Sequence, residues 1–279
     1  MLQPNLQAAI NACANDRGDV IVVSPHTYVV TTPVLFNVRG ITVIASYDIS
    51  GQDNGERFTI NADATANIAA AVISEPCTLI GIGFDSANTS MGTQPTGSPG
   101  TTYGGTIVMG AGNGFDGGNF TRLTYCRITN FGKAGAAIES WANDYLKIDH
   151  CDIDGTGGNP IGGGGANAFA QGIAITQGHF CTIEENTFRG CTYAILHGTP
   201  NPASASHSNS NFIYKGNRLI TDTAAASKLL SVNNIATYTT QNGLVADNWL
   251  PVASTAAYSD TVANLESVGV ILVGNHYKE

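Results

Sequence analysis

Short apolar runs separated by polar, glycine-rich segments recur along most of this 279-residue chain. The runs are rich in β-branched residues, as in VIVVS, GITVIA, GTIVM, GIAIT and GVILV, and Gly, Asn, Asp or Pro bounds them. No amphipathic stretch of about 10 to 15 residues separates them, which argues against the alternating strand and helix order of nucleotide-binding and barrel enzymes. The pattern therefore predicts a protein built from short strands.

The apolar positions repeat in a fixed register. The segment CTLIGIGF at 77–84 aligns without a gap on CTIEENTF at 181–188. With Asn186 as the anchor of its unit, the anchors along the chain are Ile82, Cys126, Cys151, Asn186, Asn217, Asn248 and Asn275. The residues three before and two after each anchor are apolar or aromatic throughout, as in Leu123, Ile148, Ile183 and Tyr214 before it. The anchor spacings of 44, 25, 35, 31, 31 and 27 indicate a period near 25 with insertions, and the first leaves room for an extra coil.

A unit of this length with two or three strands and no helix cannot bury its own apolar face. Stacking successive units at the strand spacing of about 4.8 Å solves the problem, and the result is a parallel β-helix. The anchors then form a vertical file, in which Cys126 and Cys151 precede Asn186, Asn217, Asn248 and Asn275. Stacked Asn amides can bond to one another, and Asn tolerates the left-handed backbone of a corner. This file is the predicted structural ladder.

The two ends of the chain differ. Residues 1–17 are expected to form a capping helix, with Asn5 as the N-cap and Leu6, Ile10 and Cys13 on one face. The last unit, GVILVGNHYKE, has no such helix, so we expect an exposed or partner-covered C-terminal edge. The chain is predicted to be a single domain over residues 1–279.

Residues 6–45 resemble the opening of pectate-lyase-like right-handed β-helix proteins. They contain a capping helix, a Gly-Asp turn, a first strand, a Pro-x-Thr-Tyr segment and a second coil, and the units at 121–279 are similar to the generic repeat. The resemblance implies an all-β, single-stranded right-handed parallel β-helix. It implies activity only loosely, because that superfamily includes pectin and alginate lyases, polysaccharide hydrolases, bacteriophage tailspikes, other virion proteins and adhesins.

Composition excludes some function classes. The net charge is −9 with only 12 Lys and Arg residues, so neither nucleic acid nor an anionic membrane is an expected partner. No apolar run reaches the roughly 18 residues of a membrane span, and the N-terminus lacks the order of a signal peptide. We expect synthesis in a host cytoplasm without a secretion signal. The six cysteines form no C-x-x-C pair and are expected to be buried thiols.

The segment LKIDHCDIDGTGGN at 146–159 is the strongest chemical candidate. In the repeat register Asp149 lies one coil below Glu184, with Thr124 beneath and Lys215 above. Adjacent coils place the two carboxylates about 5 Å apart, which suits a retaining glycosidase. Stacked carboxylates beside a lysine are equally an ordinary charged ladder. Both interpretations stay open, and Asp149 and Glu184 are the best pair if the protein is an enzyme.

The other aspartates of this segment favour a structural role. Asp152 lies beside Arg127 and Asp154 beside Arg189, which offers ion pairs between coils. The run from His150 superficially resembles a calcium loop, but its first ligand would be His and its twelfth position is Ile161 rather than Glu. We therefore expect no metal and no cofactor.

Two further motifs do not change this view. GNGFDG at 112–117 matches the dinucleotide-binding pattern G-x-G-x-x-G, but another β unit follows it instead of the helix that a pyrophosphate needs. His150, Cys151, His179 and Cys181 have spacings that match no standard zinc motif. The resembling lyases would need clustered acidic calcium ligands with an Arg or Lys base, and the resembling hydrolases would need N-x-D, D-D and G-H-G segments. Neither full set of motifs is present.

Long insertions at 85–105, 154–170, 198–211 and 251–264 are expected to protrude as loops, several of them from one side. Their small, aromatic and charge-poor residues suit neutral glycans or another protein surface. The sequence thus favours a non-enzymatic virion surface protein of a bacteriophage, a decoration (cement) protein or short spike. We expect a homotrimer that contacts other virion proteins, such as the major capsid protein, and surface polysaccharide. The alternative is a tailspike-like polysaccharide depolymerase, or an extracellular glycan-binding adhesin.

Overall fold

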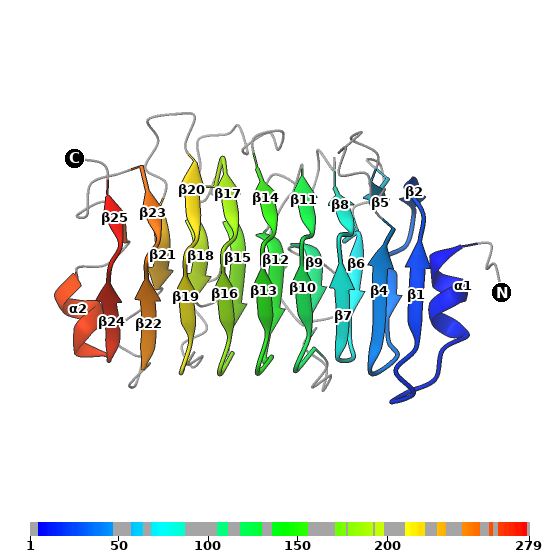
Figure 1. Cartoon of the computed structure of the whole chain (residues 1–279), viewed down its shortest axis with the longest axis horizontal. Helices are drawn as coiled ribbons and strands as arrows, with labels where there is room; N and C mark the ends of the chain where they lie inside the picture. The colour runs from blue at the N-terminus through cyan, green and yellow to red at the C-terminus, as the bar shows by residue number, and fades with distance from the viewer. Residues whose placement is uncertain are drawn as a thin grey trace.

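Three parallel sheets wind the chain into a right-handed parallel β-helix (Figure 1). The computed structural model describes residues 5–46, 57–63, 68–86, 105–110, 118–129, 136–155, 171–176, 178–191, 193–197, 210–220, 228–232, 242–251, 257–258 and 262–277. Sheets A and B have nine strands each and sheet C has seven. The predicted fold is confirmed.

The strands of each sheet come from successive coils, so each strand pairs with its counterpart one coil away. Sheet A contains β1 (Val20–Val23), β4 (Ile41–Ala45), β7 (Cys77–Ile80), β10 (Arg122–Thr124), β13 (Lys147–Asp149), β16 (Thr182–Glu184), β19 (Ile213–Lys215), β22 (Gly243–Ala246) and β24 (Val270–Val273). Sheet B contains β2 (His26–Val30), β5 (Phe58–Ala62), β8 (Gly83–Asp85), β11 (Arg127–Thr129), β14 (Asp152–Asp154), β17 (Thr187–Arg189), β20 (Arg218–Ile220), β23 (Trp249–Leu250) and β25 (His276–Tyr277). Sheet C contains β3 (Val34–Phe36), β6 (Ala71–Ile73), β9 (Gly105–Met109), β12 (Ala136–Trp141), β15 (Gln171–Thr176), β18 (Tyr193–His197) and β21 (Lys228–Val232).

The register predicted from the sequence is the register of the sheets. Ile148 pairs with Leu123 below it and with Ile183 above it, and Ile183 pairs in turn with Tyr214. All four side chains are fully buried. The long first spacing does not contain an extra coil, because β7 pairs directly with β10. The insertion therefore lengthens one coil rather than adding another.

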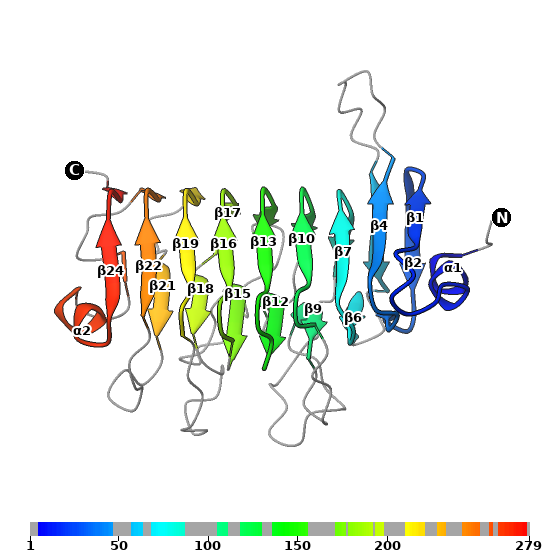
Figure 2. The same ribbon diagram turned by 60° about the horizontal axis from the view of Figure 1, so that its bottom comes forward.

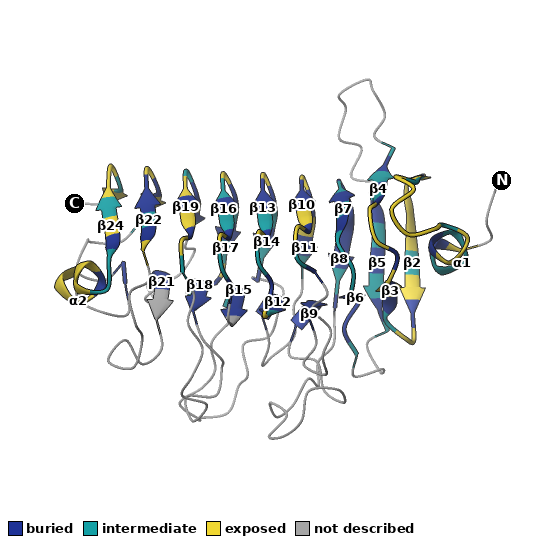
Figure 3. Cartoon of the chain, turned by 90° about the horizontal axis from the view of Figure 1, so that it is seen from below, coloured by how far each residue is buried: buried dark blue, intermediate teal, exposed yellow. Residues whose placement is uncertain are grey.

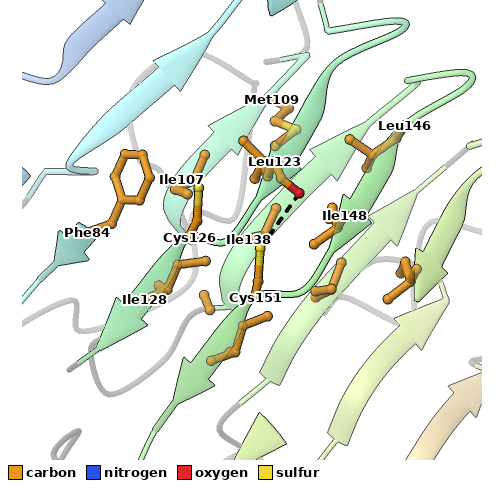
Figure 4. Close-up of a cluster of buried hydrophobic side chains, with 14 of the residues drawn as sticks. Phe84, Ile107, Met109, Leu123, Cys126, Ile128, Ile138, Leu146, Ile148 and Cys151 are labelled. Carbon is orange, nitrogen blue, oxygen red and sulfur yellow. Dashed lines mark hydrogen bonds between the residues drawn. The ribbon is translucent and has the colours of Figure 1, made fainter. Parts of the chain in front are cut away.

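The core is a continuous apolar column enclosed by the three sheets. Figure 4 shows Cys126 and Cys151 inside it, among Ile107, Ile138 and Ile148. The Cys151 thiol donates to the Leu123 carbonyl at 3.6 Å across the coils. In Figure 3 the strand interiors are buried, while exposed residues gather at the corners and at the two ends. The cysteines and isoleucines thus fill the same interior files, as the repeat predicted.

The Asn ladder is present and continuous. Asn186 donates from Nδ2 to Asn217 Oδ1 at 3.1 Å, Asn217 to Asn248 at 3.1 Å, and Asn248 to Asn275 at 2.9 Å. The same amides also donate to backbone carbonyls, such as that of Ile148 at 2.9 Å. One detail of the prediction was wrong: the left-handed residue is the one before each Asn, for example Glu185 with φ of 55°.

The N-terminal end is capped by α1 (Leu6–Asn11), which is shorter than the predicted 1–17. The Asn5 side chain accepts from the Ala8 N–H at 2.7 Å, which confirms the predicted N-cap. Leu6 and Ile10 are buried in the core. The helix ends at Asn11 with Ala12 as its C-cap, and Cys13, beyond it, is partly buried against the core.

The C-terminal end is also covered, contrary to the sequence-based expectation. The helix α2 (Val262–Ser267) contacts β24 and lies beyond it at the end of the stack, as Figures 1 and 2 both show. Leu265 is 1% exposed and belongs to the core. The helix comes before GVILVGNHYKE in the chain instead of after it. The expectation of an open edge considered only a helix that would follow the last unit. The expected trimer drew on an open C-terminal edge, and that argument no longer holds.

Most of the predicted loop residues lie outside the described part of the chain. Of 85–105, 154–170, 198–211 and 251–264, the structure describes only residues at their ends, residues 257–258 and the start of α2. Among the described residues, none of the helices is both long and apolar enough to cross a bilayer.

Candidate functional site

The candidate segment at 146–159 forms a corner between two sheets, as far as it is described. Asp149 ends β13 in sheet A, His150 takes the left-handed conformation with φ of 55°, and β14 continues into sheet B. Asp152 and Asp154 therefore lie on a different face from Asp149. The three aspartates do not form one cluster.

Asp149 is enclosed by hydrogen-bond donors. Arg122, on the neighbouring strand β10, donates from Nε to Oδ1 at 2.9 Å and from Nη2 to Oδ2 at 2.8 Å. The Thr124 hydroxyl donates to Oδ2 at 2.9 Å, and His150 Nδ1 lies 3.0 Å from the same oxygen. The side chain of Asp149 is only 1% exposed although it points away from the core. Such a two-bond Arg–carboxylate contact is the strongest ion-pair geometry available.

These contacts fix the charge of Asp149. Burial by itself raises the pKa of a carboxylate, but here the hydrogen bonds from Arg122, His150 and Thr124 outweigh burial. Together they lower the pKa of Asp149 to about 2. At neutral pH Asp149 is therefore a carboxylate whose two oxygens are both occupied.

Glu184 lies one coil above Asp149, as predicted, with Thr124 beneath and Lys215 above in the same file. Its Oε1 is 2.6 Å from Lys147 Nζ, on the neighbouring strand. Lys215 pairs instead with Asp247, at 3.8 Å on the next coil. The structure thus brings the two candidate carboxylates to adjacent positions and gives each its own cation.

His150 links two coils at the corner. Its Nδ1 contacts Asp149, and its Nε2 lies 2.9 Å from Glu185 Oε2, in the unit above. The Tyr125 ring packs beside the His150 ring at a centroid distance of 4.9 Å. The corner file is therefore held by both polar and aromatic contacts.

The aspartates in sheet B are also paired between coils. Asp152 lies 3.8 Å from Arg127 in the coil below and 3.4 Å from Arg189 in the coil above. The predicted pairing of Asp152 with Arg127 is confirmed. Asp154 stands opposite Arg189 in the register, as predicted, but the ion pair shown for Arg189 goes to Asp152.

An exposed row of aromatic rings borders the same part of sheet A. We name Phe120, Tyr145 and Phe180 the aromatic row; each stands three residues before an inward-facing residue of the repeat. Their rings stack at 4.7 and 4.9 Å with interplanar angles of 3° and 7°. Their residues are 65%, 46% and 47% exposed. Sequence reasoning missed this row, although its fixed offset from the repeat could have revealed it.

The arrangement limits what Asp149 can do chemically. A general acid must hold a proton near neutral pH, and the low pKa of Asp149 excludes that state. A nucleophile or base needs an oxygen that a substrate can reach, whereas the Asp149 side chain is only 1% exposed and is covered by Arg122 and Thr124. The contacts favour the charged ladder over the glycosidase pair. Among the described residues, no group of three His, Cys, Asp or Glu side chains is arranged to hold a metal ion.

The remaining motifs are placed as follows. All six cysteines are free thiols; five are buried, and Cys13 is partly exposed. Burial raises the pKa of Cys77 and of Cys181 to about 12, which keeps these thiols protonated. His179 Nδ1 lies 2.6 Å from the Ser210 hydroxyl. GNGFDG at 112–117 lies outside the described residues.

Comparisons with known proteins support the fold. No family model matches the chain, and no curated protein does. Among solved structures, a pectin methylesterase from Yersinia enterocolitica matches with a TM-score of 0.59 at 10% identity, over 99% of this chain and 91% of that one. A pectin methylesterase from carrot matches with 0.49 at 11% identity, over 98% of this chain and 79% of that one. An alginate lyase from a Paenibacillus species matches with 0.47 at 13% identity, over 98% and 70%. These neighbours are parallel β-helix proteins of the pectate-lyase-like superfamily.

Proposed function

We propose that this chain is a non-enzymatic structural protein on the surface of a bacteriophage particle, a capsid decoration protein or a short spike. Its partners are other virion proteins, such as the major capsid protein, or surface polysaccharide. The observation that carries the non-enzymatic part is the pairing of Asp149 with Arg122 and of Glu184 with Lys147. The two best acid–base candidates, Asp149 and Glu184, each form an ion pair with a residue on a neighbouring coil.

A stiff, charge-poor solenoid suits this role. Charged residues make up 12% of the chain, and most of the described ion pairs join different coils. Stacked coils resist local opening because every strand is bonded to a strand on each side, except at the two ends. Such a body holds a contact surface in a fixed position on a particle.

Purified particles provide the direct test. The chain is expected in particles of the phage that encodes it, at a constant copy number relative to the major capsid protein. Quantitative mass spectrometry of gradient-purified particles measures that ratio. Absence of the chain from particles that assemble in cells producing it contradicts the virion assignment.

The alternative is a polysaccharide-directed protein, and two observations favour it. The solved structure with a TM-score of 0.59 is a pectin methylesterase. The aromatic row supplies exposed ring edges beside charged side chains on sheet A, a mixture of apolar and polar groups that a sugar can contact. If the chain is an enzyme, Asp149 and Glu184 remain the pair to test.

Incubation with a panel of bacterial capsular and cell-wall polysaccharides separates the two proposals. We expect no released oligosaccharide. Release that is lost in both Asp149→Asn and Glu184→Gln would overturn the non-enzymatic assignment. Binding without cleavage, measured by retardation in polysaccharide-containing gels and weakened by Tyr145→Ala but not by Trp249→Ala, would identify a glycan-binding surface. Trp249 is the matched control because it is an exposed ring, at 59%, on sheet B.

A further inference from the structure

The outer face of sheet A is apolar at both ends of the stack. In the first strand, β1, Val20 and Val22 point outward and are 58% and 65% exposed. In the last strand, β24, Ile271 and Val273 point outward and are 62% and 54% exposed. Large apolar side chains at this exposure, repeated on one flat face, are typical of a surface that another protein covers.

The middle of the same face is charged and internally neutralised. The strands β10, β13 and β16 carry the Arg122–Asp149 and Lys147–Glu184 ion pairs. The strand β13 is the fifth of the nine strands in sheet A. The face is therefore apolar at its two ends and charged around its central strand. Arg122 lies on one side of that strand and Glu184 lies on the other.

We infer that this face binds a second copy of the chain, with the order of coils reversed. A two-fold axis parallel to the strands would place β13 over β13 and β1 over β24 of the partner. Each apolar end then covers the opposite apolar end. Arg122 then faces Thr182 of the second copy, and Lys147 and Asp149 at the axis face their own counterparts, each already paired within its own chain.

The aromatic row supports this orientation. A two-fold axis along the strands keeps the strand direction and places the row against the same row of the second copy, with Phe120 opposite Phe180 and Tyr145 at the centre. An axis along the coil stack would instead place the row against the corner that contains His150 and Glu185. Since exposed rings gain more from covering one another than from covering charges, the reversed order is favoured.

The area is sufficient for a specific contact. Nine strands at about 4.8 Å, with three to five residues in each, give a face of about 40 Å by 15 Å. That is about 600 Å² per copy and about 1,200 Å² in total, at the lower end of specific interfaces. The charges at the centre already have partners within their own chain, so covering them leaves no buried charge unpaired.

The mass of the full chain in solution tests the inference. One copy is 28.9 kDa, and we expect sedimentation equilibrium to give twice that value. Val20→Asp or Ile271→Asp places a charge against an apolar end and is expected to weaken self-association by about tenfold or more. Val29→Asp is the matched control, because Val29 is also 58% exposed but lies on sheet B. A monomer at all concentrations, a trimer, or equal effects of Val20→Asp and Val29→Asp would each overturn the inference.

A crosslinking experiment tests the reversed order. Val20→Cys and Ile271→Cys, which occupy the same position along their strands, are made separately in a Cys13→Ser background and treated with a thiol crosslinker that spans about 10 Å. The reversed order predicts crosslinked dimers only when the two variants are mixed. In the unreversed order the two positions are eight strand spacings apart, or about 38 Å, and each variant crosslinks with itself. Self-linking of either variant overturns the reversed order. The result is independent of the proposed function, because the purified chain is measured without glycan or virion components.

Discussion

Replacing Asp149 with Asn removes one charge from the best-bonded carboxylate described in the chain and changes its size little. The Asn side chain keeps one acceptor oxygen but turns the other position into a donor that faces Arg122. The two-bond contact at 2.8 and 2.9 Å is therefore lost, and the half-exposed guanidinium must turn to solvent. We expect a folded but less stable protein.

The magnitude follows from the pKa. A carboxylate in an unfolded chain titrates near 3.9, and the native pKa of Asp149 is about 2. A difference of roughly two units corresponds to about 2.5 kcal/mol at neutral pH. Solvent screening at Arg122 reduces this figure, so the expected loss in the free energy of unfolding is about 1 to 2.5 kcal/mol.

The pH dependence gives the prediction its sign. Because the folded pKa lies below the unfolded pKa, the stabilisation is complete above pH of about 4 and is lost as the pH falls through about 2. The difference between the native chain and Asp149→Asn is therefore largest at pH 7 and disappears near pH 2.

Urea unfolding followed by tryptophan fluorescence measures the difference at a series of pH values. Glu184→Gln is the control, since Glu184 and Lys147 are 29% and 39% exposed and such a pair contributes only about 0.2 to 1 kcal/mol. Equal losses for the two variants, or a difference for Asp149→Asn that does not shrink between pH 4 and pH 2, would refute the role given to Arg122.

Three further outcomes are expected. Asn217→Ala removes a fully buried rung that bonds to the Asn on each side and to backbone groups, and it is expected to cost about 2 to 4 kcal/mol. Asn275→Ala, at the partly exposed last rung, is expected to cost less. Chemical unfolding compares the two variants, and equal costs would contradict a cooperative ladder. Tyr145→Ala removes two ring stacks and Phe120→Ala removes one, so the thermal midpoint is expected to fall further for Tyr145→Ala, each stack contributing about 0.5 to 1.5 kcal/mol. Burial shields five of the six thiols, so a thiol reagent at pH 8 is expected to modify only Cys13 in the native protein and all six cysteines in urea. Fast native modification of more than one thiol would contradict this.

The register could be predicted from the sequence because contacts in a solenoid run between equivalent positions of neighbouring units. A constant offset from the anchor therefore became a file in space, as Ile148, Ile183 and Tyr214 show. The same reasoning placed Glu184 beside Asp149. The repeat therefore predicted both the fold and the vertical order of the side chains.

The partner of Asp149 could not be predicted in the same way. The register sets Thr124 beneath Asp149, but the decisive bonds come from Arg122, two residues earlier on the same strand. A long side chain reaches diagonally across a ladder, and its direction depends on rotamers that spacing does not specify. The left-handed corner was recoverable, because Gly216 and Gly274 occupy the file of His150 and Glu185. Residues that favour positive φ in one file indicate the shape of the whole file.

The helix α2 was missed for a different reason. Its six residues are too few for an apolar period to appear, and Leu265 alone supplies its buried contact with the core. Short helices of this kind are stabilised by the surface on which they lie, not by their own sequence. Only the stacked coils reveal that such a surface exists.

The position of α2 in the chain, before the final strands instead of after them, sets a rule for redesign. Trimming from the C-terminus removes β25 and β24 before it reaches α2, so a shortened solenoid would expose the edge of β22 to other chains. Extra coils have to be inserted between inner coils, for instance between β14 and β16, so that the capping helices α1 and α2 both stay in place. The solenoid can therefore be lengthened by inserting inner coils but not shortened by trimming its C-terminus.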